Sequence, residues 1–459
     1  MLLQFLVENY RSFQGETLLN LVPAKSRIHR DHEIKDTEKG RKVKALPLAL
    51  FYGANASGKS NLIKAIAFAR RLIVTGTRPN QIIGVVPFLL DKNSAFSPSK
   101  FEFVLKYKGV LYTYGFAVTK QCVVEEWLMA VLNRKEVVMF ERNTQADHVT
   151  VEFGEQMAVS SEVAQRLKFL AEGTRPNQLF LTEAFSRNES SVKDLVDWFT
   201  NVLNIVYPNT IYEPLVLRAH GDKTFAKNVG KILKLADTGI DSLVLHKERF
   251  DANQHFRSMP DEFRKQMLND LSLTPGHAVL IEDAGQLYAL SLDEEHNPTV
   301  LSLTTSHLAT DGSPVEFSTK DESDGSRRLM HLAPVLLNLQ NSERVYVIDE
   351  LDRSLHPHIS RMFIETFLSG IVSGENKGQL LVSTHDTCLM DFDILRRDEV
   401  WFVEKDKAGA SHISSLIEYD VRSDLRVDKG YLNGRFGAIP MIGCSKRLTG
   451  GCKNEPVVP

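Results

Sequence analysis

The stretch that decides the fold of this chain is Phe51-Tyr52-Gly53-Ala54-Asn55-Ala56-Ser57-Gly58-Lys59-Ser60. It fits G-x-x-x-x-G-K-[ST], the pattern of a loop that wraps around phosphate groups. Gly53 and Gly58 allow backbone angles that side chains forbid, so successive N–H groups can turn toward phosphate oxygens. Lys59 places a positive charge beside the β- and γ-phosphates, and Ser60 offers a hydroxyl to Mg²⁺. The stretch therefore predicts binding of a nucleoside triphosphate with Mg²⁺.

The residues around this loop favour the same interpretation. The apolar run from Ala45 to Tyr52 is typical of a buried strand, and Ser60 to Arg71 has helical spacing. Such a helix would point its positive N-terminus at the phosphates. The alternative is a chance match in a glycine-containing turn, and the order strand, loop, helix disfavours it.

The composition of the chain is typical of a soluble globular protein. The chain has 459 residues, enough for two or three domains, with 43% hydrophobic and 25% charged residues, as in soluble globular proteins. The net charge of -3 gives no overall basic field, so any contact with nucleic acid would need a local patch. The four cysteines have no C-x-x-C spacing, which disfavours a zinc site and a disulfide framework. Because no signal-peptide pattern or membrane-length apolar run occurs, we expect a cytoplasmic protein without membrane contact.

The N-terminal third is predicted to be rich in strands. Two strands, Leu2–Val7 and Glu16–Val22, precede a polar stretch from Pro23 to Lys44. We favour a solvated loop for that stretch over a nucleic-acid patch, because acidic residues are interspersed among the basic ones. Further strands, which predict an antiparallel lobe, are expected at Phe101–Tyr107, Val110–Val118, Val123–Leu132, Val137–Glu141 and Val149–Phe153.

The middle of the chain changes to helical spacing. Helices are expected at Ser160–Ala171, Ser191–Leu203, Phe225–Leu235 and Pro260–Leu271, and strands return at Ala278–Glu282, Leu287–Leu292 and Thr299–Thr304. The predicted domains are residues 1–155, with the phosphate loop and the β lobe, 156–275, a helical insertion, and 276–459, the C-terminal part. From Gly434 onward we expect an irregular tail.

Two acidic residues end a second apolar strand, Arg344 to Ile348. Asp349 is suited to hold the Mg²⁺ that bridges two phosphates, and Glu350 is suited to polarise the attacking water. The alternative is that both acids cap the next helix. His385 ends another apolar strand, and because ligands bind at the carboxyl ends of strands in open α/β sheets, we expect it to sense the γ-phosphate.

The order of several motifs resembles that of the ATPase heads of ABC type. These motifs are Gly53 to Ser60, Ser323-Asp324-Gly325, Val345 to Glu350, Asp352 and His385. Such heads include the structural-maintenance-of-chromosomes (SMC), RecF and overcoming-lysogenization-defect proteins, and Asn9-Tyr10-Arg11-Ser12-Phe13 resembles their N-F-[KR]-S-F opening. More narrowly, the chain resembles bacterial AAA-family ATP-binding proteins of ABC type, of the kind found in anti-phage defence systems. The stretches that carry this resemblance are Glu322 to Leu329, Leu351 to Pro357 and Gly434 to Pro440. The resemblance implies an α/β fold, an ABC-type P-loop NTPase head with an antiparallel β lobe and a helical insertion.

The resemblance also implies roles for single residues. Ser323 and Gly325 would form the signature motif, which contacts the γ-phosphate bound by a second subunit, and Asp352 would lie on the D-loop across that interface. The predicted catalytic residues are Glu350 and His385, and the predicted metal ligands are Ser60 and Asp349. The predicted nucleotide-binding residues are Gly53, Asn55, Gly58, Lys59, Ser60, Asn61, Arg11, Ser323, Gly325 and Asp352.

The sequence departs from the pattern of these heads at two places. Glu322 and Asp324 stand where the transporter motif L-S-G-G-Q has leucine and glycine, which leaves the geometry of this loop open. No glutamine of a Q-loop is evident, and Gln81 is the weak candidate.

Three classes of function compete. A transporter subunit is disfavoured because no membrane segment is encoded, and an overcoming-lysogenization-defect nuclease is disfavoured because too few residues follow Glu404 for a Toprim domain. The resemblance favours an ATP hydrolase that works as a homodimer or higher oligomer with ATP at its interface. It implies a sensor that gates a separate effector, such as a nuclease, in anti-phage defence. The alternative is a RecF- or SMC-like DNA-binding ATPase in repair or recombination, although the long coiled-coil arms of SMC proteins are missing.

Overall fold

The computed structural model describes residues 1–36, 42–145, 148–209, 214–251, 254–256, 259–273, 278–283, 285–340, 342–420 and 426–439. The chain divides into two compact units. The first unit holds Met1–Leu203 and Gln379–Pro459, and the second holds Asn204–Gly378. The predicted partition at residues 155 and 275 is drawn differently and stays a prediction.

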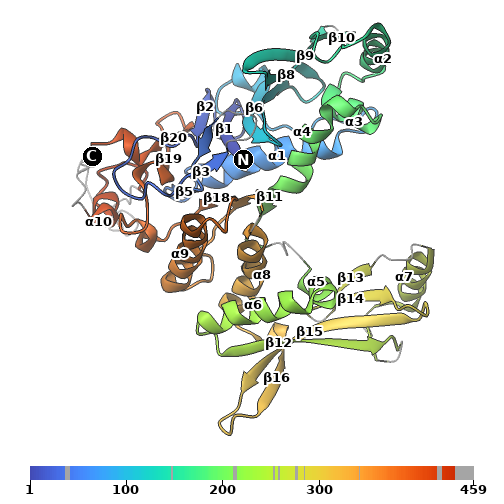
Figure 1. Ribbon diagram of the computed structural model, residues 1–459, viewed down its shortest axis with the longest axis vertical. Coiled ribbons are helices and arrows are strands. Elements are labelled where there is room, and N and C mark those ends of the chain that lie inside the picture. The colour runs from blue at the N-terminus through green and yellow to red at the C-terminus, as the bar shows by residue number, and fades with distance from the viewer. Residues whose placement is uncertain are drawn as a thin grey trace, which may run out of the picture. The chain divides into compact units, whose positions relative to one another are not determined.

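An antiparallel sheet forms the N-terminal part of the first unit, as predicted (Figure 1). Its strands alternate buried and more exposed residues, so that Phe101, Phe103 and Leu105 lie on one face. The strands Ser99–Tyr107 and Val110–Val118 form a hairpin that turns at Lys108 and Gly109, whose φ angles of 46° and 75° suit a type I′ turn. The order of the strands is β10 (His148–Phe153), β9 (Lys135–Gln145), β8 (Val123–Leu132), β7 (Val110–Val118), β6 (Ser99–Tyr107), β1 (Leu2–Glu8) and β2 (Thr17–Asn20).

A buried ion pair joins this sheet to the helices that follow it. The side chains of Glu126 and Arg142 are 0% exposed, and their closest charged atoms, Oε2 and Nη1, are 3.4 Å apart. Glu126 also accepts hydrogen bonds from the backbone N–H groups of Phe180 at 2.6 Å and Leu181 at 2.9 Å. Burial raises the pKa of Glu126, and the charge of Arg142 opposes that rise.

We expect Arg142→Met to lower the free energy of unfolding by about 3–5 kcal/mol, because it leaves the Glu126 carboxylate buried without its cation. Urea unfolding of the purified chain measures this change. Lys108→Met, which breaks the exposed pair between Lys108 and Asp194, should have a far smaller effect. Equal losses of stability in the two variants would contradict the prediction.

The first unit also contains the strands that lead to the phosphate loop. All five residues of β5 (Leu48–Tyr52) are buried. This strand pairs in parallel with β18 (Gln379–Ser383) on one side and with β19 (Val400–Lys405) on the other, and β20 (Ser411–Ser415) pairs antiparallel with β19. Helix α1 (Lys59–Thr75) follows the loop. The predicted order of strand, loop and helix is thereby confirmed.

Helices of the first unit pack beside the antiparallel lobe. They are α2 (Ser161–Glu172), α3 (Phe180–Ser186), α4 (Lys193–Asp197) and the π-helical turn η4 (Trp198–Val202), which confirm the first two predicted helices of the middle region. Phe199 of η4 meets Phe103 of β6 edge to face, with ring centroids 5.0 Å apart. The segment 156–275 also contains the strands β11 (Leu203–Val206) and β12 (Ile240–Arg249), which the sequence did not indicate.

Two stretches predicted to be irregular pack against the core of the first unit. Within Pro23–Lys44, the strands β3 (Ile34–Asp36) and β4 (Val43–Ala45) pair, and buried Arg396 donates to the carbonyl oxygen of Ala24 at 2.8 Å. Glu33 bonds Lys44 at 2.6 Å, which weakens the case for a basic patch. The prediction of a wholly solvated loop was therefore wrong.

The second stretch is the predicted tail, and its first residues are part of the core. Phe436 is 1% exposed and stacks on Phe402 of β19, with ring centroids 5.4 Å apart. Tyr431 of α10 (Val427–Leu432) stacks on Phe402 as well. Burial raises the pKa of Tyr431, opposed by a hydrogen bond with the backbone of Gly53. Residues 434–439 are irregular, as predicted, but they pack against the core instead of extending as a tail, and 440–459 lie outside the described residues.

The second unit contains a sheet covered by helices. The sheet has the order β12, β15 (Pro298–Leu308), β14 (Gln286–Leu292) and β13 (Ala278–Asp283), and β16 (Pro314–Ser318) pairs with the end of β15. Helices α5 (Leu215–Gly221) and α6 (Lys223–Leu235) contact this sheet, and α6 runs along β12 (Figure 1). Helix α7 (Asp261–Leu273) packs on β13 and β14 through Met267 and Leu271.

The same unit contains the elements that carry the remaining predicted site residues. They are α8 (Asp324–Leu339), β17 (Val345–Ile348) and α9 (Pro357–Ser373). All four residues of β17 are buried, as expected of the strand before Asp349. Of the helices in the described part of the chain, none combines the length and the apolar composition that crossing a bilayer requires.

Candidate functional site

The phosphate loop connects β5 to α1, and both of its glycines are required by close approach. Gly53 has φ 158°, and a Cβ atom there would lie 2.2 Å from the carbonyl oxygen of Val403. Gly58 has φ 122°, and its Cβ would lie 2.3 Å from the hydroxyl of Ser411. Neighbouring strands β19 and β20 therefore press against the loop. Only glycine fits at either position.

Lys59 holds the loop closed from the first turn of α1. Its side chain is buried, and Nζ donates to the carbonyl oxygens of Gly53 at 2.7 Å and Ala54 at 3.2 Å. Asn55 is exposed in the loop, and Ser60 and Asn61 are partly exposed. The first turn of α1 has no acidic residue, so the positive end of the helix dipole is not neutralised locally. This arrangement favours an anion at the loop.

Arg11 lies on a turn that is attached to α1. Its backbone has φ 52°, and its Nε donates to the hydroxyl of Tyr10 at 3.2 Å. That hydroxyl donates in turn to the carbonyl oxygen of Lys64 at 3.3 Å. Asn61 donates to the hydroxyl of Ser12 at 2.9 Å, which ties the same turn to the start of the helix. Arg11 is therefore positioned beside the first turns of α1.

His385 lies beside the phosphate loop in the first unit. It follows β18, in which Ser383 pairs with Phe51 of β5, and the N–H of Thr384 donates to the carbonyl oxygen of Phe51 at 3.1 Å. Its side chain is exposed. The loop and His385 thus stand at the carboxyl ends of adjacent parallel strands, where ligands of α/β proteins bind.

Gln81, the weak Q-loop candidate, is in a different place. It lies just beyond the C-terminal end of α1, where its side chain accepts a hydrogen bond from the N–H of Arg78 at 2.9 Å. The 17 residues of α1 separate its two ends by about 25 Å. The structure gives no support to Gln81 as a nucleotide contact.

In the second unit, Ser323 caps the N-terminus of α8. Its hydroxyl accepts a hydrogen bond from the N–H of Ser326 at 3.1 Å, and the residue is exposed. A Cβ atom on Gly325 would lie 2.8 Å from the carbonyl oxygen of Ser354, so the start of α8 packs closely against the predicted D-loop. Asp324 forms an ion pair with Arg327 one turn later. Ser323 and Gly325 therefore occupy a helix start that is fixed against the loop containing Ser354.

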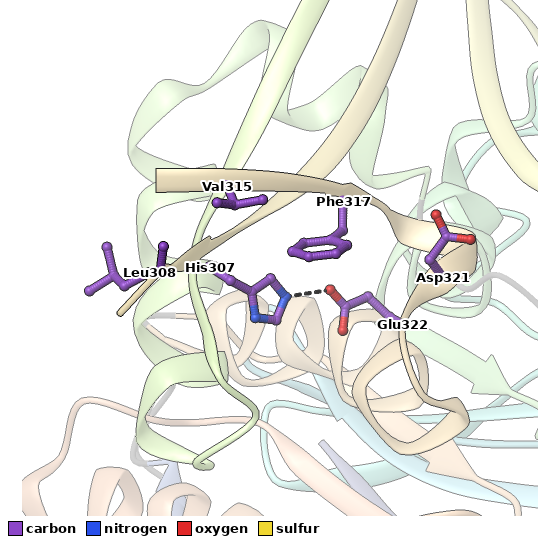
Figure 2. A pocket seen from close by; sticks show the side chains of 7 residues that line it. His307, Leu308, Val315, Phe317, Asp321 and Glu322 are labelled. Atoms are coloured by element: carbon purple, nitrogen blue, oxygen red, sulfur yellow. Dashed lines mark hydrogen bonds and ion pairs between the residues drawn. The ribbon is translucent and has the colours of Figure 1, made fainter. Parts of the chain in front are cut away.

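Glu322 explains one departure from the transporter motif. Its carboxylate accepts a hydrogen bond from Nε2 of His307 at 2.7 Å (Figure 2). It also accepts one from the hydroxyl of Thr305 at 2.5 Å. Both partners lie on β15, and the ring of Phe317 from β16 stands edge-on to His307. A leucine could make neither bond. We infer that Glu322 anchors the signature loop to the neighbouring sheet.

The residues after β17 form a tight turn. Asp349 is 4% exposed, and its N–H donates to the carbonyl oxygen of Val206 at 2.9 Å. Glu350 has φ 50°, a left-handed angle that is costly for a residue with a side chain. Its side chain is 41% exposed and lies 3.9 Å from the guanidinium of Arg353. Asp352 is partly exposed and accepts a backbone hydrogen bond from Leu355.

Arg328 is the functional candidate that sequence reasoning missed. This residue of α8 is 6% exposed, and it donates to the carbonyl oxygens of Asp349 at 3.3 Å and Glu350 at 3.2 Å. It also donates to those of Tyr207 and Pro208. Arg328 thus joins the signature helix to the strained turn that holds both predicted acids. The position of Arg328 directly after the predicted signature motif could have pointed to it in the sequence. The carbonyl oxygens that it bonds, however, lie on segments far away along the chain.

Next to Arg328 on the same helix, His331 has an altered protonation equilibrium. Burial, reinforced by the charges of Arg328 and Arg327, lowers the pKa of His331 to about 4. Between this value and the ordinary pKa of about 6.5, the unfolded chain binds a proton that the folded chain does not. The free energy of unfolding therefore falls as the pH is lowered through this window.

We expect His331→Gln to reduce the loss of stability between pH 7 and pH 5 by about 2 kcal/mol, because a glutamine takes up no proton on unfolding. Urea unfolding at several pH values measures the slope. His358→Gln replaces an exposed histidine and should leave the slope almost as in the unmodified chain. An unchanged slope in His331→Gln would count against the prediction.

The structure thus brings the predicted residues together in two groups. The first unit holds the phosphate loop, Arg11 and His385, and the second unit holds Ser323, Gly325, Asp349, Glu350 and Asp352. A hydroxyl from Ser60 and a carboxylate from buried Asp349 are oxygen donors of the kind that Mg²⁺ prefers. The donor chemistry therefore fits the predicted metal ligands, and their roles stay a prediction.

Comparison with known proteins gives one family. A family model described as "AAA domain, putative AbiEii toxin, Type IV TA system" matches residues 48–153 and 217–391. A search of the curated proteins finds no match. The matched ranges include the phosphate loop, the predicted signature residues Ser323 and Gly325, both acids after β17 and His385.

Two solved structures are similar to the chain. One is the SMC head domain from Thermotoga maritima, with 12% identical residues and a TM-score of 0.36, covering 90% of this chain and 98% of that one. The other is an SMC head bound to the C-winged helix domain of ScpA, with 12% identity and a TM-score of 0.40, covering 90% of this chain and 97% of that one. Because the family model covers more than half of the 459 residues, the chain belongs to this family of AAA-domain proteins.

Proposed function

We propose that the chain is an ABC-type ATPase that binds ATP with Mg²⁺ and hydrolyses it slowly at a site completed by a second copy. The observation that carries this proposal is the phosphate loop. Gly53 and Gly58 stand where no side chain fits, and Lys59 is drawn into the loop by two carbonyl oxygens. Main-chain N–H groups, a lysine and a helix N-terminus are the elements that bind the phosphates of a nucleotide.

The chemistry assigned to each residue follows from its functional groups. Lys59 would contact the β- and γ-phosphates, and Ser60 and Asp349 would supply oxygen ligands to Mg²⁺, which when bound would neutralise part of the phosphate charge. Glu350 accepts a proton from the water whose oxygen attacks the γ-phosphorus, while the bond to the bridging oxygen breaks and ADP leaves. His385, beside the loop, contacts the γ-phosphate. Arg328 keeps Glu350 in place by bonding the backbone of its turn.

The contribution of the second copy to the site would come from its predicted signature loop, which contains Ser323. Ser323 stands exposed at the N-terminus of α8, a 16-residue helix, and the start of such a helix is suited to an anion. We propose that this end contacts the γ-phosphate bound by the other copy. ATP then holds two copies together, and hydrolysis weakens the contact because the charge-assisted bonds to the γ-phosphate are lost.

The family match supports a proposal for the role in the cell. Its description names a type IV toxin–antitoxin system, and the sequence resembles ATPases of anti-phage defence. We propose that the chain is the sensor or regulatory component of such a system and gates a separate effector, such as a nuclease. ATPase assays with and without DNA test the alternative, because strong stimulation by DNA would favour a RecF-like repair ATPase.

Mass photometry of Glu350→Gln with ATP, with ADP and without nucleotide tests the interfacial site. We expect a dimer or larger oligomer with ATP only, since this variant binds ATP and does not hydrolyse it. Adding Ser323→Arg, which places a bulky side chain at the start of α8, should prevent the assembly. The same mass under all three conditions would contradict ATP as the interfacial ligand.

A further inference from the structure

The outer face of the antiparallel sheet in the first unit contains a groove of about 520 Å³. Its lining residues lie on β6, β8, β9 and β10. Neighbouring residues of a strand point to opposite faces of the sheet, so this face is opposite to the one that carries Phe101 and Phe103. Those two rings pack on Phe68 of α1 and Phe199 of η4. The groove therefore lies on the face that these two elements do not cover.

Four glutamates line the groove with side chains that are at least partly exposed: Glu102, Glu125, Glu141 and Glu152. Glu141 of β9 and Glu152 of β10 stand directly opposite each other in the register of the two strands. The Cβ atoms of such a pair are about 4.5–5.5 Å apart, and two like charges there destabilise a sheet. In the described part of the chain, Glu125, Glu141 and Glu152 have no hydrogen-bond or ion-pair partner for their side chains. The sheet thus keeps an uncompensated repulsion at this place.

The lysine that lines the groove does not neutralise these acids. Nζ of Lys100 pairs with Glu16 at 3.2 Å and stands 5.7 Å from the centre of the Trp127 ring. A cation within about 6 Å of an indole face is attracted to the ring. Trp127 therefore already attracts one cation, while the glutamates on the other strands keep their charge.

The indole of Trp127 is held in a fixed position. Gly115 of β7 stands between Trp127 and Glu102 in the register of the strands, and a Cβ atom on Gly115 would lie 2.3 Å from Cζ2 of Trp127. The ring thus crosses β7 over the glycine and donates from Nε1 to Glu102 at 2.8 Å. Glu141 is the register partner of Trp127 on its other side. An aromatic ring held between two carboxylates suits a guanidinium or ammonium group.

The spread of these groups indicates the class of ligand. Among the residues that the structure describes, no three His, Cys, Asp or Glu side chains are placed to hold a metal ion. Nucleic acid is disfavoured, because its phosphates would meet the glutamates. From Glu102 on β6 to Glu152 on β10 there are four strand spacings, about 19 Å. An extended polypeptide of about six residues covers that distance.

We propose that this groove binds a lysine- or arginine-rich segment of a partner protein in an extended conformation. One basic side chain lies on the exposed part of the Trp127 ring, and others lie between the carboxylates of Glu125, Glu141 and Glu152. The bound cations remove the repulsion between Glu141 and Glu152, which favours binding. The binding does not depend on ATP. The further step, that the partner is the gated effector, rests on the proposed function.

Binding of a synthetic peptide of alternating arginine and serine to the full-length chain without nucleotide tests the proposal. Tryptophan fluorescence reports it, because Trp198 and Trp401 are 0% and 5% exposed and Trp127 is the third tryptophan of the sequence. We expect the peptide to change the fluorescence at about 0.15 M salt, and a peptide of alternating glutamate and serine to leave it unchanged. Trp127→Phe, which keeps an aromatic ring over Gly115, should remove the change.

Glu141→Gln combined with Glu152→Gln should weaken the affinity for the basic peptide about five- to ten-fold, since it removes two exposed ion-pair partners. Its Tm should be at least that of the unmodified chain, because the repulsion between the two strands is gone. Weaker binding would then not be due to unfolding. Glu162→Gln combined with Glu172→Gln is the matched control. It removes two exposed glutamates from α2 of the same unit and should keep the affinity.

Equal losses of affinity in the two double variants would show attraction by net charge only and would overturn the proposal. A basic peptide that does not bind, or a fluorescence change that persists in Trp127→Phe, would overturn it as well. If the tetra-amine spermine binds as tightly as the peptide and depends on the same glutamates, the ligand is a small polycation and not a partner protein. The ATPase measurements require nucleotide and these do not, so failure of one proposal leaves the other standing.

Discussion

Replacing Glu350 with glutamine is expected to lower kcat for ATP hydrolysis by about 10²–10⁴-fold, the range typical of losing a general base. The amide keeps the size of the side chain but accepts no proton at neutral pH. Because Arg328 donates to the main-chain carbonyl oxygen of Glu350, the turn should keep its left-handed conformation. ATP affinity should therefore change little. Steady-state phosphate release and equilibrium binding of a fluorescent ATP analogue measure the two quantities.

Glu365→Gln is the control for this variant. Glu365 lies on α9, is 46% exposed and bonds an arginine, as Glu350 approaches Arg353. The two variants therefore make the same chemical change in similar surroundings. A kcat for Glu350→Gln within a few-fold of the Glu365→Gln value would show that Glu350 is not the base.

The parts of the site that sequence predicts well are those set by neighbours along the chain. The order of β5, loop and α1 follows from an apolar run, two glycines and helical spacing within about 25 residues of each other. Each of these features expresses a local requirement. Buried strands need apolar residues on both faces, and a loop around phosphates needs glycine.

The parts that sequence misses depend on distant segments. Arg328 can be recognised as a support for Glu350 only when α8 and the turn after β17 are packed together, because its four acceptors are main-chain atoms that any residue supplies. Glu322 looks like an error in a motif until β15 brings His307 and Thr305 to it. Phe436 looks like part of a tail until it stacks on Phe402. In each case the pattern lies in pairs of residues that are far apart along the chain.

Replacing Lys59 with alanine should weaken ATP binding by at least about 10–100-fold, because charge-assisted bonds to phosphate oxygens are each worth roughly 1.5–3 kcal/mol. The structure adds a second reason. Nζ of Lys59 holds the carbonyl oxygens of Gly53 and Ala54, so its loss also removes the bonds that close the loop before the nucleotide arrives. Binding then requires the loop to be ordered at additional cost. Isothermal titration with ATP and Mg²⁺ measures the affinity.

Lys64→Ala separates these effects from a general loss of positive charge. Lys64 lies on the same helix, a little more than one turn further on, and is exposed. Both variants lower the net charge by one, but only Lys59→Ala removes a group that the loop encloses. We therefore expect Lys64→Ala to bind ATP almost as the unmodified chain does. If the two variants lose affinity equally, the attraction of ATP comes from the charge of the whole surface. If neither loses affinity, nucleotide binding does not take place at this loop, and the proposed ATPase has no site.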